Sequence, residues 1–230
     1  MKPFFYVVAG PNGVGKSTAS FQYLPAGVEL INSDDIARQI RQQQTHQEVI
    51  QRLTNEAAQA RIQQHLSKRE PFAVETNLHD AETWQYFKAL QQTGYEFRLL
   101  FICLDDLPIL YQRVINRHVQ GGHFVRDDVI RGRYAAGLSL LNHFFATPDN
   151  LTLLDASDQL QVVYQRIDGE VTIQQTPQPN WVLLNLADHM TNAGSDATLP
   201  ATPASIDEIR ARYQQQMGKN RPDLPDSPIH

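Results

Sequence analysis

Between residues 10 and 17 the chain reads Gly10-Pro11-Asn12-Gly13-Val14-Gly15-Lys16-Ser17, which matches the pattern G-x-x-x-x-G-K-[ST] at every fixed position. The apolar run Phe4–Ala9, a predicted buried strand, precedes it, and a helix is predicted to begin near Lys16. A strand before and a helix after form the context in which this pattern cradles phosphate, because backbone N–H groups and the helix N-terminus favour phosphate oxygens. The stretch therefore predicts a nucleotide site.

The residue types of this loop also predict separate roles. We expect Lys16 to reach the β- and γ-phosphates of ATP, Ser17 to ligate Mg²⁺ and Thr18 to hydrogen-bond a phosphate. The remaining loop residues are predicted to hold the nucleotide through their backbone: Gly10, Pro11, Asn12, Gly13, Val14 and Gly15. The alternative interpretation is a chance or degenerate match that binds no nucleotide.

Composition narrows the class of protein. The 230 residues carry 20 Lys plus Arg against 25 Asp plus Glu, a net charge of −5, which argues against a nucleic-acid coat or an anionic-membrane binder. The single cysteine, Cys103, excludes a disulfide framework and a cysteine-based zinc site and favours the reducing cytoplasm. The apolar runs fall far short of the ~18–20 residues that a membrane helix needs. We expect a cytoplasmic protein.

Short apolar runs alternate with helical stretches up to residue 155, which predicts a doubly wound α/β fold with a mainly parallel five-stranded sheet. The predicted strands are Phe4–Ala9, Val28–Asn32, Phe72–Glu75, Phe97–Leu104 and Leu151–Asp155. The predicted helices begin near Lys16, at Ile36 and after Asp106, and cover Thr45–Lys68, Ala81–Gln92 and Asp128–Phe145. Thr45 and Glu48 have the spacing of a capping box at the start of the longest helix.

The pattern changes after this core, which we expect to span residues 1–157. In 158–190, Asp168-Gly169 predicts a hairpin turn between Gln159–Arg166 and Glu170–Gln175, followed by a short helix near Trp181–Met190, both packed on the core. Residues 191–230 hold five of the 13 prolines and few large apolar residues, so they predict a mostly flexible tail. A short helix over 205–217 is the alternative there.

Asn32-Ser33-Asp34-Asp35 follows the second predicted strand, at the edge where ligands of open α/β sheets bind. A carboxylate there can accept the proton of an acceptor hydroxyl or help to hold Mg²⁺, and we assign both tasks to Asp34. The alternative is that Asp34 or Asp35 caps the following helix. Asp105 or Asp106, after the fourth strand, could similarly be a hydrolytic acid or a helix cap.

Glu75-Thr76-Asn77 closes the third predicted strand at the same edge, where the side chains could hold substrate hydroxyls. A turn cluster of polar residues is the alternative. Five arginines then fall within 21 residues around Gly121-Gly122, which predicts a mobile lid whose guanidinium groups grip phosphoryl oxygens. They are Arg113, Arg117, Arg126, Arg131 and Arg133. The alternative is a solvated helix face with i, i+4 ion pairs.

Five motifs in this order together resemble the zeta-toxin family, over about residues 3–155. They are Ala-Gly-Pro-Asn-Gly-Val-Gly-Lys-Ser-Thr, Ile-Asn-Ser-Asp-Asp-Ile-Ala, Phe-Ala-Val-Glu-Thr, Arg-Val-x-x-Arg-x-x-x-Gly-Gly-His-x-Val and Arg-Tyr. The chain is most similar to the short branch labelled UDP-N-acetylglucosamine kinases or predicted ABC-type ATPases. It departs from the family pattern at Asn77, where threonine is usual, and at Arg126, where proline is usual.

The resemblance implies a three-layer P-loop kinase fold like that of nucleoside kinases. It also implies that ATP and Mg²⁺ phosphorylate the 3′-hydroxyl of a UDP-amino sugar, with Asp34 as base, and that a protein antitoxin is a partner. Glu75, Thr76, Asn77 and His123 would then contact the acceptor, Arg113, Arg126 and Arg133 the nucleotide, and Arg117 the transferring phosphoryl group.

Two other hypotheses about the function are also compatible with the sequence. The same loop, base and lid would serve a kinase of another metabolite, a nucleoside or a polynucleotide end. An ATP-driven switch or transport ATPase is disfavoured, because the chain contains no LSGGQ motif and its predicted lid resembles those of kinases.

Overall fold

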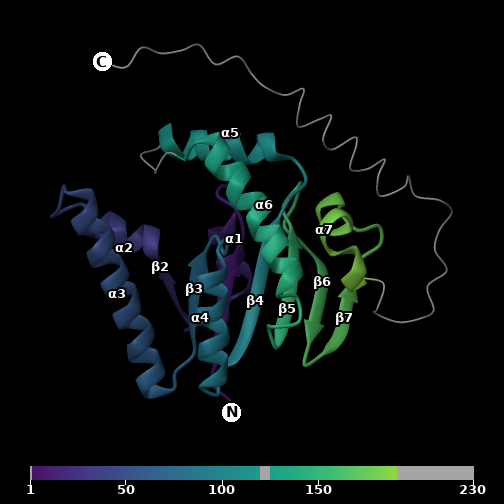
Figure 1. Ribbon diagram of the computed structural model, residues 1–230, viewed down its shortest axis with the longest axis horizontal. Coiled ribbons are helices and arrows are strands. Elements are labelled where there is room, and N and C mark those ends of the chain that lie inside the picture. Colours follow the sequence, from purple (N-terminus) through teal and green to yellow (C-terminus); the bar gives the residue numbers. More distant parts are fainter. Residues whose placement is uncertain (1, 120–124, 191–230) are drawn as a thin grey trace, which may run out of the picture. The chain divides into compact units, whose positions relative to one another are not determined.

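The computed structural model describes residues 2–119 and 125–190. Within these residues, a seven-stranded sheet has the order β2-β3-β1-β4-β5-β6-β7 (Figure 1). Its strands are β1 (Phe4–Ala9), β2 (Glu29–Asn32), β3 (Phe72–Thr76), β4 (Glu96–Cys103), β5 (Asn150–Asp155), β6 (Gln161–Ile167) and β7 (Glu170–Gln174). The strands from β2 to β5 in that order are parallel, and β6 and β7 are antiparallel additions at one edge.

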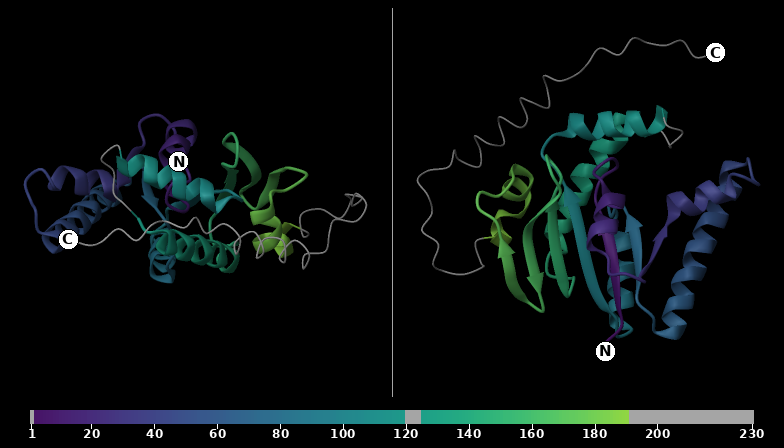
Figure 2. Two further views of the ribbon diagram at one scale, coloured as in Figure 1. Left: turned by 90° about the horizontal axis from the view of Figure 1, so that it is seen from above. Right: turned by 180° about the vertical axis from the view of Figure 1, so that it is seen from behind.

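Helices lie on both faces of the sheet. Figures 1 and 2 show α4 and α6 over one face and α1 over the other, which makes the three layers of the α/β P-loop kinase fold. The pair α2 and α3 extends beyond the edge strand β2. The helices are α1 (Lys16–Tyr23), α2 (Ser33–Ile40), α3 (Gln47–Lys68), α4 (Ala81–Gln92), α5 (Leu107–Val119), α6 (Asp127–His143) and α7 (Asn180–Met190). No helix among the described residues is both long and apolar enough to cross a membrane.

Aromatic rings fill the core between the sheet and α4. The ring of Phe5 in β1 stacks on Phe72 of β3 and Phe97 of β4, at centroid distances of 5.7 and 5.0 Å. Phe87 of α4 stacks on Phe5 at 5.9 Å, and all four side chains are at most 2% exposed. Burial of large rings on neighbouring strands stabilises the parallel register that aligns the strand ends.

The five parallel strands confirm the predicted strands to within one residue at each end. The hairpin is also confirmed, because Asp168 and Gly169 have φ angles of 50° and 85°, as a two-residue turn requires. It does more than the sequence predicted, since β6 pairs with β5 and so widens the main sheet. The helix α7 forms where predicted, whereas its packing on the core stays a prediction and residues 191–230, including 205–217, lie outside the described residues.

Two predicted helix starts were wrong. The helix expected at Ile36 begins at Ser33, because the side chain of Asn32 accepts a hydrogen bond from the backbone N–H of Asp34 at 2.8 Å and caps it. The helix expected at Thr45 begins at Gln47; its N-cap is His46, with no side-chain cap bond, so the predicted capping box is not formed. Neither Asp34 nor Asp35 is therefore the cap of α2; both lie in its first turn.

Candidate active site

The glycine loop runs from the end of β1 into α1 and packs tightly against its neighbours. Gly10, Gly13 and Gly15 have φ angles of 144°, 81° and 103°, a region that favours glycine. A Cβ at Gly10 would collide with the carbonyl oxygen of Ile102, and one at Gly13 would lie 2.8 Å from the carbonyl oxygen of Leu110. The backbone itself therefore forms the surface of the loop, which fits a cradle for phosphate oxygens.

The other loop residues divide between the interior and the surface. Pro11 and Val14 are buried and Asn12 is half-buried, whereas Ser17 and Thr18 are exposed in the first turn of α1. An exposed hydroxyl at a helix N-terminus fits the predicted role of Ser17 toward Mg²⁺. In the described part of the chain, no group of three or more His, Cys, Asp or Glu side chains could hold a metal by itself. Such an ion would thus depend on phosphate and water ligands as well.

Lys16 folds back over its own loop. Its Nζ donates hydrogen bonds to the carbonyl oxygens of Gly10 and Pro11, at 2.9 and 3.2 Å, and to Oδ1 of Asn77 at 3.0 Å. Burial lowers the pKa of the Lys16 ammonium from 10.5 to about 8, although the carboxylates of Glu75 and Asp34 act in the opposite direction. The ammonium is thus held by uncharged oxygens beside two acidic groups.

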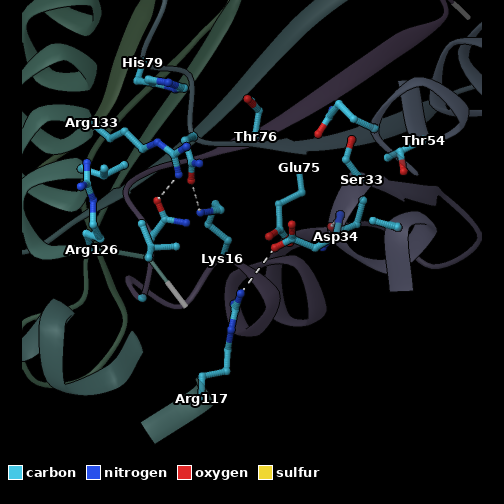
Figure 3. Close-up of a pocket in the computed structure, with 18 of the residues that line it drawn as sticks. Lys16, Ser33, Asp34, Thr54, Glu75, Thr76, His79, Arg117, Arg126 and Arg133 are labelled. Atoms are coloured by element: carbon cyan, nitrogen blue, oxygen red, sulfur yellow. Dashed lines mark hydrogen bonds and ion pairs between the residues drawn. The ribbon is translucent and has the colours of Figure 1, made fainter. Parts of the chain in front are cut away.

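Asp34 lies in the first turn of α2, where the helix dipole stabilises its negative charge. Arg117 of α5 reaches across to it, with 3.4 Å between Nη2 and Oδ2 (Figure 3). The neighbouring Asp35 instead pairs with Arg38 on the outside of α2, at 2.9 Å. The two aspartates that the sequence left as alternatives therefore face different surroundings, and Asp34 is the one in the cleft.

Three polar side chains at the end of β3 differ in their hydrogen-bond partners. Oε2 of Glu75 is buried without a hydrogen-bond partner, and desolvation raises the pKa of this carboxyl although Lys16 opposes the shift. The hydroxyl of Thr76 accepts a hydrogen bond from the backbone N–H of Leu78 at 3.1 Å, which shapes the turn after the strand. Asn77 holds Lys16. Figure 3 shows Lys16, Asp34 and Glu75 pointing into the same space.

The predicted lid arginines separate into two groups. Arg117, Arg126 and Arg133 line the cleft, and Nη1 of Arg133 donates to Oδ1 of Asn12 in the loop at 2.9 Å. Arg126 is exposed and pairs with Asp128 at 3.2 Å. Arg133 thus connects α6 directly to the glycine loop.

The other two arginines contact protein oxygens elsewhere. Nη2 of Arg113 donates to the carbonyl oxygen of Ala156 at 3.3 Å, and Nε of Arg131 donates to the hydroxyl of Tyr111 at 3.4 Å. His123 and the predicted Gly121-Gly122 hinge lie outside the described residues. Closure of a lid therefore stays a prediction.

The two acidic residues after β4 are not among the residues that line the cleft. The backbone N–H of Asp105 donates to the hydroxyl of Ser157 at 3.4 Å. Asp106 stands directly before Leu107, the first residue of α5, which is the position of a helix cap.

A cleft of about 710 Å³ opens from the glycine loop between α2–α3 and α5–α6, and the side chains that line it include Lys16, Asp34 and Glu75. Sequence reasoning missed the residues on its α2–α3 side, Ala37, Arg41, Gln47, Gln51 and Thr54. It also missed His79, whose pKa is lowered by burial and by Arg133. Helical spacing was the available signal, because Asp34, Ala37 and Arg41 recur at i, i+3 and i+7.

Comparisons with known proteins agree with this architecture. The model of the AAA_33 family, described as an AAA domain, matches residues 6–141. An uncharacterized protein of Haemophilus influenzae is 31% identical over 135 residues, which cover 58% of this chain and 92% of the relative. The segment that the family model matches, residues 6–141, contains the glycine loop, Asp34, Glu75 and the arginines of α5 and α6.

Solved structures share the fold at low sequence identity. A crystal structure of AvrRxo1-ORF1:AvrRxo1-ORF2 with sulphate ions has a TM-score of 0.60 and 16% identity, covering 93% of this chain and 76% of that one. The PezAT chromosomal toxin–antitoxin system of Streptococcus pneumoniae has a TM-score of 0.55 and 15% identity, covering 94% and 86%. At these identities the similarity shows the fold.

Proposed function

This chain belongs to the AAA_33 family and is a P-loop kinase domain by family and fold, and from that premise we propose that it phosphorylates a small-molecule hydroxyl with ATP and Mg²⁺. The acceptor we propose is the amino-sugar hydroxyl of UDP-N-acetylglucosamine. One observation carries the proposal: the cleft that opens from Lys16 also contains Asp34, and both belong to a family-matched segment.

Asp34 is the base in this proposal. Its carboxylate accepts the proton of the acceptor hydroxyl while the hydroxyl oxygen forms a bond to the γ-phosphorus and the bond to the β,γ-bridging oxygen breaks, which releases ADP. This carboxylate is 63% exposed and lies in the first turn of α2, so an acceptor hydroxyl in the cleft can reach it. Arg117 lies close enough to bind the transferring phosphoryl oxygens once it leaves Asp34.

The loop and α6 hold the nucleotide. Lys16 and the backbone of residues 10–17 neutralise and orient its phosphates, and Arg133 stays fixed beside them through its hydrogen bond to Asn12. Ser17 and Asp34 are the residues that would hold Mg²⁺, which would supply positive charge to stabilise the nucleotide phosphates.

Glu75 is suited to bind the sugar. Its unpartnered buried Oε2 needs a hydrogen-bond donor, and a sugar hydroxyl or acetamido N–H supplies one. Thr76 and Asn77 follow it at the end of β3 and complete the predicted acceptor contacts, together with His123.

A protein antitoxin remains part of the proposal. The support is the resemblance to the zeta-toxin motifs, together with the fold shared with a toxin–antitoxin system. Growth arrest on expression of the wild-type chain, but not of Lys16→Ala, would be the expected outcome. Equal growth of both strains would contradict a toxic role.

ADP release in the presence of different acceptors tests the proposed reaction. We expect turnover with ATP and Mg²⁺ to depend on UDP-N-acetylglucosamine, and less on UDP-glucose, uridine or an oligonucleotide. Phosphate should be found on the sugar by mass spectrometry. Lys16→Ala is the inactive control, with an expected loss of about 3 kcal/mol or more in transition-state stabilisation. ADP release that no acceptor stimulates would contradict kinase activity, and stimulation by a different compound would replace the acceptor.

A further inference from the structure

One face of α2 lines the cleft along its whole length. Asp34, Ala37 and Arg41 are all lining residues, and their i, i+3, i+7 spacing places them on a single stripe. Arg41 is the C-cap of α2 and keeps helical backbone angles, with φ −61° and ψ −18°. At about 1.5 Å per residue, it lies about 10 Å along the helix axis from Asp34.

The facing stripe of α3 is polar and uncharged. Gln47, Gln51 and Thr54 line the same cleft at i, i+4 and i+7. The buried Thr54 hydroxyl donates to the carbonyl oxygen of Ile50 at 2.7 Å, which fixes its orientation. This side of the cleft therefore offers amide and hydroxyl groups, with Arg41 as its cation among the described residues.

Arg41 differs from the arginines on the opposite side of the cleft. There, Arg117 pairs with Asp34, Arg126 with Asp128, and Arg133 binds Asn12. Within the described residues, the ion pairs of α2 are Asp35 with Arg38 and Asp34 with Arg117, and neither includes Arg41. Its exposed guanidinium faces the cleft without a carboxylate of the described chain to neutralise it.

We infer that Arg41 binds a phosphate group of the acceptor, held about 10 Å from the hydroxyl that Asp34 deprotonates. This rests on the proposed function, because it presumes that the acceptor hydroxyl meets Asp34. A guanidinium binds phosphate oxygens through two parallel N–H donors, which orients the molecule as well as attracting it. In the proposed function the nucleotide phosphates bind beside Lys16, and the acceptor hydroxyl meets Asp34 at the far end of the stripe from Arg41, so the group at Arg41 belongs to the second substrate. The cleft thus selects an acceptor with a hydroxyl at one end and a phosphate or diphosphate further along.

Binding of UDP and uridine by calorimetry tests this inference, with the glycine loop first saturated by Mg²⁺ and a non-hydrolysable ATP analogue. We expect the full-length wild-type chain to bind UDP more tightly than uridine, and Arg41→Ala to weaken UDP binding at least about tenfold. Arg41→Lys should recover part of the affinity, because it restores charge without the bidentate geometry. Arg38→Ala, an exposed arginine on another face of α2, is the matched control and should bind UDP like the wild type.

The outcomes separate this inference from the proposed function. Equal UDP affinity in the wild type and Arg41→Ala, equal affinity of the wild type for UDP and uridine, or no UDP binding at all would each overturn it. If UDP binds through Arg41 but UDP-N-acetylglucosamine is not phosphorylated, the proposed acceptor is wrong, whereas phosphate binding by Arg41 is supported. If that acceptor is phosphorylated, Arg41→Ala should raise its KM about tenfold while kcat and the KM for ATP change little. An unchanged KM would overturn the inference and leave the kinase activity intact.

Discussion

Nζ of Lys16 donates a hydrogen bond to Oδ1 of Asn77, across 3.0 Å, and so joins the glycine loop to the end of β3. The two residues are 61 positions apart in the chain, yet the strands that precede them are neighbours, with Ala9 of β1 in register with Thr76 of β3. Every oxygen that receives a hydrogen bond from Lys16 in this arrangement is uncharged. Phosphate oxygens form stronger, charge-assisted bonds to an ammonium, so nucleotide can displace these partners.

Asn77→Asp should therefore weaken ATP binding by about tenfold or more, because a carboxylate at this position would pair with Lys16 and repel the phosphates. Asn77→Ala should change the dissociation constant by no more than about threefold, since the carbonyl oxygens of Gly10 and Pro11 still hold the ammonium. Titration with a fluorescent ATP analogue measures both. Gln85→Glu, on the exposed face of α4, changes the net charge equally away from the cleft. Equal ATP affinity of Asn77→Asp and this control would contradict the prediction.

ATP affinity should fall as the pH rises above about 8. Burial lowers the pKa of the Lys16 ammonium to about 8 in the free protein. Above that pH, a growing fraction of the protein molecules therefore carries an uncharged Lys16. Bound phosphate favours the charged form, so the dissociation constant should rise up to about tenfold per pH unit until the pKa of the complex is reached. Lys16→Arg should show no such dependence, since a guanidinium stays charged throughout. A flat wild-type profile between pH 7 and 10 would contradict the assignment.

Asp34→Asn should lower kcat by several orders of magnitude and leave ATP binding nearly unchanged, because an amide cannot accept the proton. Asp35→Asn is the matched control: its carboxylate is exposed and pairs with Arg38, outside the cleft. Acceptor-dependent ADP release and ATP titration together measure the two effects. If Asp35→Asn loses turnover and Asp34→Asn does not, the base has been assigned to the wrong residue.

Much of the fold could be predicted because its signals are local. The strands are short apolar runs bounded by polar residues, and the glycine loop is a contiguous pattern whose glycines adopt the backbone angles that only glycine adopts easily. Asp34 and Glu75 could be placed in one cleft by a general rule, since parallel strands end at the same edge of a sheet. The pairing of β6 with β5 could not, because either edge of a hairpin can extend a sheet.

The start of α2 could not be predicted correctly, because it depends on one capping side chain. Asn32 caps α2 three residues earlier than the apolar pattern indicated, and this earlier start puts Asp34 and Arg41 on one stripe. The direction in which a long side chain points could not be predicted from the sequence either. Arg113 and Arg117 are one helical turn apart, yet one binds the carbonyl oxygen of Ala156 and the other binds Asp34. Only the positions of β5 and α2 relative to α5 decide which arginine enters the cleft.

Arg117→Ala should accordingly lower kcat, whereas Arg113→Ala should lower thermal stability. The Arg117–Asp34 pair has side chains that are 52% and 63% exposed, and such pairs contribute less than about 1 kcal/mol to folding. Arg117→Ala should therefore leave Tm within a few degrees of the wild type, yet lower kcat about a hundredfold by removing a group that stabilises charge on the transferring phosphoryl group. Arg113→Ala should lower Tm more, because it removes the half-buried hydrogen bond to the carbonyl oxygen of Ala156 that ties α5 to the segment after β5.

Thermal denaturation and steady-state kinetics on both variants check these two predictions, with Arg38→Ala as the control for loss of an exposed arginine. An Arg113→Ala variant that keeps its Tm but raises the KM for ATP would place that guanidinium on the nucleotide, and an Arg117→Ala variant with wild-type kcat would remove Arg117 from the reaction.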